Sequence, residues 1–69
     1  MVGQTRPLTR RERQILALVV DGHANREIAR RLGVSERTVK NQLYALFQKV
    51  GVRSRLQLAV WALRKHFVE

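Results

Sequence analysis

The sequence predicts an all-α fold in which four short helices form one compact domain. Three observations lead to this prediction. No stretch alternates apolar and polar residues over the length of a strand. The only proline, Pro7, precedes the first segment with helical periodicity. Helix-capping residues and glycines then alternate along the chain, which is a pattern typical of short helices joined by tight turns. The predicted helices span residues 10–21, 26–32, 36–50 and 55–66.

A capping box opens the first helix. In the run Thr9-Arg10-Arg11-Glu12, the Thr9 side chain and Glu12 are each placed to satisfy a free N–H group of the first turn. Leu8 precedes the cap and is expected to pack against the helix as an apolar staple. Asp21-Gly22 ends the helix at a residue that tolerates the left-handed conformation. Residues 1–7 are predicted to be a linker or tail.

The other three helices have similar signals. Asn25 is a strong N-cap residue for the second helix, and Gly33 ends that helix. Ser35 is expected to cap the third helix, which ends before Gly51. A second capping box begins at Ser54 and opens the fourth helix. The connections between the predicted helices are therefore only two to four residues long.

Residues 25–44 combine a short helix, a three-residue turn and a longer helix, which is the helix-turn-helix pattern. Gly33 supplies the backbone conformation that a sharp reversal needs. Val34 is expected to fill the space between the two helices. Ala29 keeps one face of the second helix small, so that the third helix can approach closely.

The composition favours a polyanionic partner. Fourteen Lys and Arg residues against five Asp and Glu give a net charge of +9 among 69 residues, and eleven of the fourteen are Arg. Both nucleic acid and an anionic membrane surface meet this description. However, no apolar run approaches the roughly 20 residues that cross a bilayer, and no signal peptide opens the chain. Charge alone does not choose between the two partners. Together with the helix-turn-helix pattern and the two faces of the predicted third helix, it leads us to expect a nucleic-acid partner and no membrane.

Catalysis and metal binding are not expected. The chain has no cysteine, which excludes disulfides and thiolate metal sites and favours an intracellular, cytoplasmic location. His23 and His66 lie far apart in the sequence, without the spacing of a metal site. No nucleophile has a partner base nearby in the sequence. The prediction is a protein without enzymatic activity, cofactor or metal.

The predicted third helix has two different faces. Its expected buried stripe consists of Val39, Leu43, Leu46, Phe47 and Val50. Its expected outer face carries Arg37, Lys40, Asn41, Tyr44 and Gln48. This outer set has the donors, acceptors and aromatic edge that read base edges in the major groove. Two alternatives remain: the outer face is only a solvated helix face, or Tyr44 is a half-buried core residue.

Four ordered runs of residues resemble the LuxR-type helix-turn-helix family of bacterial regulators, also known through its NarL, FixJ and GerE members. The resemblance covers residues 8 to about 63, within a predicted domain of residues 8–67. The matching runs are Leu8-Thr9-x-Arg11-Glu12-x-x-Ile15-Leu16, Gly22-x-x-Asn25-x-Glu27-Ile28-Ala29-x-x-Leu32, Ser35-x-x-Thr38-Val39-Lys40 and Lys49-Val50-Gly51-Val52-x-Ser54-Arg55-x-x-Leu58-Ala59. The resemblance implies that the helix 36–50 enters the major groove of double-stranded DNA and that two copies bind a two-half-site operator.

The resemblance, together with the position of each residue on the predicted helices, suggests roles for individual residues. The expected base contacts are Lys40, Asn41 and Tyr44. The expected phosphate contacts are Asn25, Arg37, Thr38, Arg53 and Arg55. Glu12 and Glu27 match structural positions. Gln42 departs from the family, which usually has His there, and we expect altered detail at this contact rather than lost binding.

The fourth helix has more apolar surface than one buried face requires. We expect Leu56, Ala59, Val60 and Leu63 to face inward. A second stripe consists of Leu58, Trp61, Ala62 and Lys65 and is the expected homodimer contact. The resemblance agrees, because this helix forms the homodimer contact in the family. The alternative is that Trp61 folds back and completes the core. Dimerisation through this helix is expected to be weak in the absence of DNA.

The leading hypothesis is a transcription regulator, or the output domain of a response regulator, that recognises a DNA sequence and contacts RNA polymerase. An adaptor that binds a protein through its basic face is one alternative, and the DNA-binding part of a sigma factor is another.

Overall fold

The computed structural model describes residues 8–65, which contain four α-helices and no strand. The helices are Arg10–Val20 (α1), Asn25–Leu32 (α2), Glu36–Val50 (α3) and Arg55–Lys65 (α4). The predicted all-α fold is therefore confirmed, and each predicted helix boundary inside residues 8–65 lies within one residue of the observed one. The predicted tail at 1–7 and the predicted ends at residues 66 and 67 lie outside the described residues.

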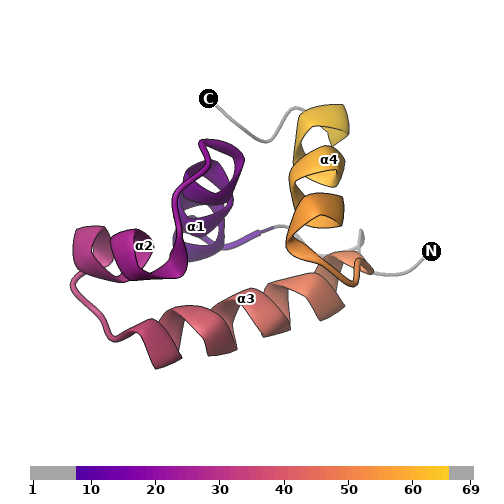
Figure 1. Ribbon diagram of the computed structural model, residues 1–69. Helices are drawn as coiled ribbons and strands as arrows, with labels where there is room; N and C mark the ends of the chain where they lie inside the picture. Colours follow the sequence, from indigo (N-terminus) through magenta and orange to yellow (C-terminus); the bar gives the residue numbers. More distant parts are fainter. Residues whose placement is uncertain (1–7, 66–69) are drawn as a thin grey trace.

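The longest helix, α3, extends across one side of the domain (Figure 1). α2 lies over the N-terminal half of α3, and α4 stands over its C-terminal end. α1 packs against both α3 and α4, while α2 packs mainly against α3. This arrangement leaves one long side of α3 uncovered by the other helices.

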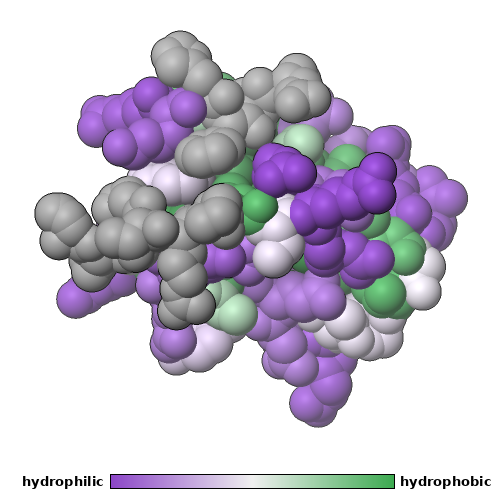
Figure 2. All heavy atoms as spheres, turned by 180° about the vertical axis from the view of Figure 1, so that it is seen from behind, coloured by the Kyte–Doolittle hydropathy of each residue, from purple (hydrophilic) through white to green (hydrophobic). Residues whose placement is uncertain are grey.

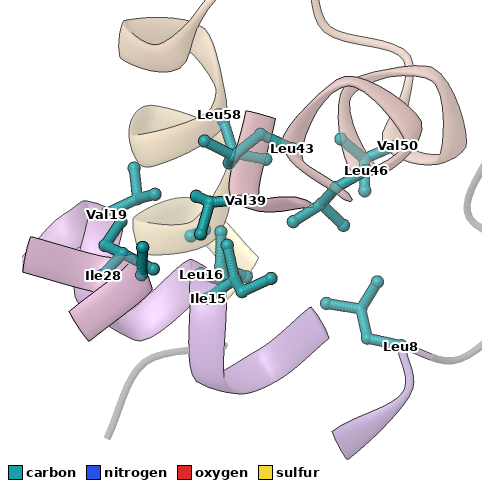
Figure 3. Packing of buried hydrophobic residues seen from close by; sticks show 12 residues of the cluster. Leu8, Ile15, Leu16, Val19, Ile28, Val39, Leu43, Leu46, Val50 and Leu58 are labelled. Carbon is teal, nitrogen blue, oxygen red and sulfur yellow. The ribbon is translucent and has the colours of Figure 1, made fainter. Parts of the chain in front are cut away.

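All four helices contribute to one hydrophobic core (Figure 3). Leu8, expected as the staple before α1, is 6% exposed and belongs to this core. Each large side chain that is fully buried stabilises the fold by about 1.5–3 kcal/mol relative to exposure. The core residues are Leu8, Ile15, Leu16, Val19, Ile28, Ala29, Val39, Leu43, Leu46, Val50, Leu58 and Ala62.

The capping box of α1 is confirmed. The Glu12 N–H donates to Thr9 Oγ1 at 3.1 Å, and the Thr9 N–H donates to Glu12 Oε1 at 2.8 Å. At α4 only half of the predicted box forms as expected. The Gln57 N–H donates to Ser54 Oγ at 3.1 Å, but Gln57 Oε1 accepts the N–H of Arg53 at 2.8 Å, one residue before the expected position.

The expected N-cap role of Asn25 is wrong. α2 begins at Asn25, and its N-cap is Ala24, which has extended backbone angles and no side-chain capping bond. The Asn25 side chain instead accepts a hydrogen bond from Arg55 of α4. A long-range partner has therefore replaced the local capping bond that the sequence suggests.

The turn between α2 and α3 has the predicted geometry. Gly33 adopts φ 71°, a left-handed conformation that a residue with a β-carbon enters only at a cost. The Val34 N–H then donates to the carbonyl of Ala29 at 3.0 Å, which closes the end of α2. Val34 is partly buried against the core, and Ala29 is almost fully buried, which agrees with the packing expected of both residues.

The predicted faces of α4 are largely wrong, although Ala59 of the expected inner stripe is partly buried against the core and Lys65 of the outer stripe is exposed. Leu58 and Ala62, assigned to an outer stripe, are fully buried. Trp61 of the same stripe is partly buried against the core, in agreement with the alternative that it completes the core. Leu56, Val60 and Leu63, assigned to the inner stripe, are 74%, 38% and 53% exposed. α4 is apolar around most of its circumference, so its own periodicity does not distinguish the two faces. Packing against α1 selects the face with the small Ala62.

Candidate nucleic-acid interface

α3 separates its apolar and polar side chains as predicted. Val39, Leu43, Leu46 and Val50 are buried, and Phe47 is partly buried against the core. On the uncovered side, every member of the expected outer set is exposed. This set consists of Arg37, Lys40, Asn41, Tyr44 and Gln48. Tyr44 is 64% exposed, which excludes the alternative that it is a half-buried core residue.

A shallow hollow lies on this side of the molecule, between the start of α2 and the first half of α3. Its position brings Asn25, the first residue of α2, beside side chains of α3. Glu36, which directly precedes Arg37, also lines the hollow, although it is not among the expected contacts. The hollow is lined by Asn25, Glu36, Arg37, Lys40, Asn41 and Tyr44.

Asn25 is held from the other side by Arg55. Arg55 Nη1 donates to Asn25 Oδ1 at 2.7 Å, and Arg55 Nη2 donates to the backbone carbonyl of His23. Both terminal nitrogens of Arg55 therefore make bonds within the protein. Nothing in the sequence indicates this contact, because the bonded residues lie 30 and 32 positions apart.

Thr38 and Ser35 form a second hydrogen-bonded pair beside the hollow. The Thr38 N–H donates to Ser35 Oγ at 3.0 Å, and the Ser35 hydroxyl donates to Thr38 Oγ1 at 3.0 Å. Ser35 thus caps α3 as predicted. The cap holds Thr38 at the first turn of α3, where the helix dipole favours an anion.

Glu27 binds two arginines on the exposed side of α2. Its carboxylate accepts hydrogen bonds from Arg30, at 2.6 Å for the shorter contact, and from Arg31 at 2.8 Å. These bonds, Arg30 first, lower the pKa of Glu27 from its ordinary value of 4.5 to about 2. Both ion pairs could be predicted from the sequence, because residues three and four positions apart are neighbours on a helix.

Glu12 joins the start of α1 to the end of α3. Lys49 Nζ lies 2.8 Å from Glu12 Oε1, and both side chains are partly buried. Burial raises the pKa of Glu12, but hydrogen bonds from Lys49 and Thr9 outweigh this effect and leave the pKa lower than ordinary. The sequence predicts a capping and structural role for Glu12 but not its ion pair with Lys49.

Gln42 lies beside the buried stripe of α3. Its Oε1 atom is buried and has no hydrogen-bond partner within residues 8–65. A buried carbonyl left in this way costs about 1–3 kcal/mol. Gln42 does not line the hollow that gathers the expected DNA contacts.

Hydrophilic side chains cover much of the face opposite to the view of Figure 1, with smaller hydrophobic patches between them (Figure 2). In the described part of the chain, no helix is long and apolar enough to span a membrane. Across residues 8–65, no group of three or more His, Cys, Asp or Glu side chains is placed to hold a metal ion.

The fold and this surface define a helix-turn-helix DNA-binding domain. Residues 6–62 match the family of bacterial regulatory proteins described as the luxR family. The chain belongs to this family, which decides against the sigma-factor alternative.

Relatives and a solved structure agree with this assignment. The chain is 51% identical to a probable csgAB operon transcriptional regulatory protein of Salmonella typhimurium over 80% of its own length, which is 26% of that relative. It is 44% identical to the spore germination protein GerE of Bacillus subtilis, covering 88% of this chain and 84% of GerE. The solved structure of the transcription factor GerE superposes with a TM-score of 0.83 at 37% identity, covering 93% of this chain and 97% of that one. Several relatives are much longer, and the chain spans about a quarter of the csgAB regulator.

Proposed function

We propose that this domain binds double-stranded DNA in a sequence-specific manner, with α3 in the major groove. The observation that carries the proposal is the gathering of donors and acceptors on the uncovered side of α3, opposite its buried stripe. A major groove about 12 Å wide admits one helix, and the uncovered long side of α3 carries the polar side chains. The net charge of +9 supplies the attraction to phosphate that any such complex needs.

Lys40, Asn41 and Tyr44 are the proposed base contacts. Lys donates to guanine O6 and N7, and Asn forms a pair of hydrogen bonds with adenine. The Tyr44 hydroxyl donates and accepts, so it adds a contact that depends on the base it meets. All three side chains line the same hollow, which supports their acting on adjacent base pairs.

Asn25, Arg37, Thr38 and Arg53 are the proposed phosphate contacts. Arg37 and Arg53 are exposed, and Thr38 lies in the first turn of α3, where free N–H groups and the dipole attract an anion. The expected direct contact by Arg55 has less support, because both of its terminal nitrogens bind within the protein.

A second copy of the chain is the proposed occupant of the exposed apolar face of α4. This face carries Leu56, Val60 and Leu63 and adjoins a hollow lined partly by Trp61 and Lys65. Trp61 and Lys65 therefore remain in the proposed dimer contact, whereas Leu58 and Ala62 are buried inside the subunit and cannot reach a second copy. Sedimentation velocity of a Leu63→Glu variant on a two-site duplex tests this contact: one bound copy is expected where the native chain binds two. Two bound copies of the variant would contradict it.

Selection of bound duplexes from a random library tests DNA recognition directly. Asn41→Ala and Tyr44→Phe are expected to relax base preference, each by an amount on the order of 1–3 kcal/mol. Arg37→Ala is expected to weaken binding to all duplexes alike and to reduce the dependence on salt. Equal losses on every duplex for all three variants would exclude readout by α3. Affinity that hardly changes with salt would favour the adaptor alternative instead.

The wider role that fits these properties is transcription regulation in the bacterial cytoplasm, as a regulator or as the output domain of a response regulator that contacts RNA polymerase. The family's role in regulation supports a chain without catalytic activity.

A further inference from the structure

Arg55 makes a contact that joins α4 to the hollow on α3. It is the first residue of α4, and its two terminal nitrogens bind Asn25 Oδ1 and the carbonyl of His23. α4 packs mainly on α1, whereas α2 packs mainly on α3. The arginine therefore ties the start of α2, which lines the hollow, to a helix on the other side of the domain.

The start of α2 has no local side chain to hold it. Its N-cap residue is Ala24, which offers no capping hydrogen bond. Arg55 donates hydrogen bonds on both sides of this cap, to the His23 carbonyl before it and to Asn25 Oδ1 after it. Within residues 8–65 the Arg55 guanidinium has no carboxylate partner. Its terminal nitrogens donate to these two neutral oxygens instead.

The chemistry of arginine determines which way the Asn25 amide points. A guanidinium has five N–H donors and no acceptor. The amide atom that faces it must therefore be the oxygen, and the NH₂ group of Asn25 remains for another partner. Two amide donors suit a phosphate oxygen, whereas an amide presenting its carbonyl would repel one.

We propose that Arg55 is a positioning residue for DNA binding, which orients the Asn25 amide so that its NH₂ group donates to a phosphate and which holds the start of α2 against α4. This inference rests on the proposed function. It gives Arg55 an indirect role, in contrast to the phosphate contact expected from the sequence.

Arg55→Lys separates the two roles because it retains the charge and loses the fork of donors. A lysine ammonium remains a good phosphate ligand but does not bridge two fixed oxygens in the same way. If Arg55 positions Asn25, Arg55→Lys lowers affinity for a selected duplex about tenfold, the effect of one lost charge-assisted hydrogen bond. In an Asn25→Ala background the same change has no further effect, because the side chain to be positioned is absent.

Asn25→Asp provides an independent measurement. A carboxylate strengthens the bond to Arg55 but removes the donors, so this variant should unfold no more readily than the native chain in urea and still bind DNA more weakly. Arg10→Lys is the matched control, since Arg10 is exposed and has no bonded partner within residues 8–65. It is expected to bind as the native chain does.

Two results would overturn the inference. Native affinity for Arg55→Lys would show that charge alone suffices, and an equal loss in both Asn25 backgrounds would show a direct contact. Hydrogen exchange of the free protein tests, without DNA, whether Arg55 holds the start of α2. The amides of His23 and Ile28 donate to the Leu18 and Ala24 carbonyls and should exchange faster in Arg55→Lys. Unchanged exchange would show that Arg55 does not hold the start of α2. A native chain that binds no duplex would instead refute the proposed function.

Discussion

Gln42 and Glu27 are polar side chains whose surroundings give them opposite effects on stability. Gln42 points its carbonyl into a buried site without a partner inside residues 8–65, while Glu27 accepts hydrogen bonds from two arginines. The Gln42 carbonyl is therefore an unsatisfied acceptor, whereas the Glu27 carboxylate is neutralised by two arginines. Each difference leads to a measurable expectation.

Gln42→Met is expected to leave the free energy of unfolding unchanged or raise it by about 1 kcal/mol, since it removes an unsatisfied buried carbonyl and keeps the length of the side chain. Gln42→Ala is the control, because it removes the same carbonyl together with the packing of the stem. Urea denaturation measures both. A large loss of stability in Gln42→Met would mean that the amide has a partner in the folded protein.

Glu27 should contribute to stability in a pH-dependent way. Its pKa in the folded chain, about 2, lies below the ordinary value of 4.5, so its contribution is present above pH 4.5 and disappears as the pH falls toward 2. The stability difference between the native chain and Glu27→Gln should therefore shrink over this interval. Thermal unfolding at a series of pH values measures it. Parallel curves for the two proteins would contradict this assignment, and added salt should reduce the difference because the site is exposed.

At the scale of elements, the start of α1 concentrates several local interactions. Thr9 and Glu12 complete the capping box, Lys49 reaches Glu12 from the end of α3, and Arg13 donates to the Leu8 carbonyl at 2.8 Å. α1 lies against both α3 and α4, so the order of its first turn affects the packing of two other helices.

Thr9→Ala is expected to cost about 1 kcal/mol of unfolding free energy, the usual effect of removing an N-cap side chain. Thr9→Ser keeps the hydroxyl and should recover most of this loss. Chemical denaturation of the three proteins measures it. If the serine variant were no more stable than the alanine variant, a role other than capping would have to explain Thr9.

At the scale of the whole molecule, the orientation of α4 decides which surface is core and which is open to a second copy. Leu58 and Leu56 are two residues apart on α4, but only Leu58 is buried. The same chemical change at the two positions therefore distinguishes the observed orientation from the one expected from the sequence.

Leu58→Ala should destabilise the domain by about 2–5 kcal/mol, as for other buried leucines, whereas Leu56→Ala should change the stability of the free chain very little. On a two-site duplex, Leu56→Ala should weaken the binding of the second copy. Folded Leu58→Ala protein should bind the second copy with little change. Equilibrium unfolding and DNA titration measure the two effects. A destabilising Leu56→Ala would show that α4 packs with its other face inward.

The sequence by itself determined the local features of this protein. Capping residues and glycines fixed the helix boundaries to within one residue, because caps act over three or four neighbouring positions. The division of α3 into two faces was also predictable, because its apolar residues recur with a clear helical period. The outer set from Arg37 to Gln48 is exposed as expected.

Only the tertiary structure decided the features that depend on distant partners. The orientation of α4 required α1, since a helix that is apolar around most of its surface has no unique inner face. The bond between Arg55 and Asn25 and the ion pair between Lys49 and Glu12 join residues 30 and 37 positions apart. No local rule of spacing reaches that far, so these contacts, and the placement of Asn25 beside α3, followed from packing alone.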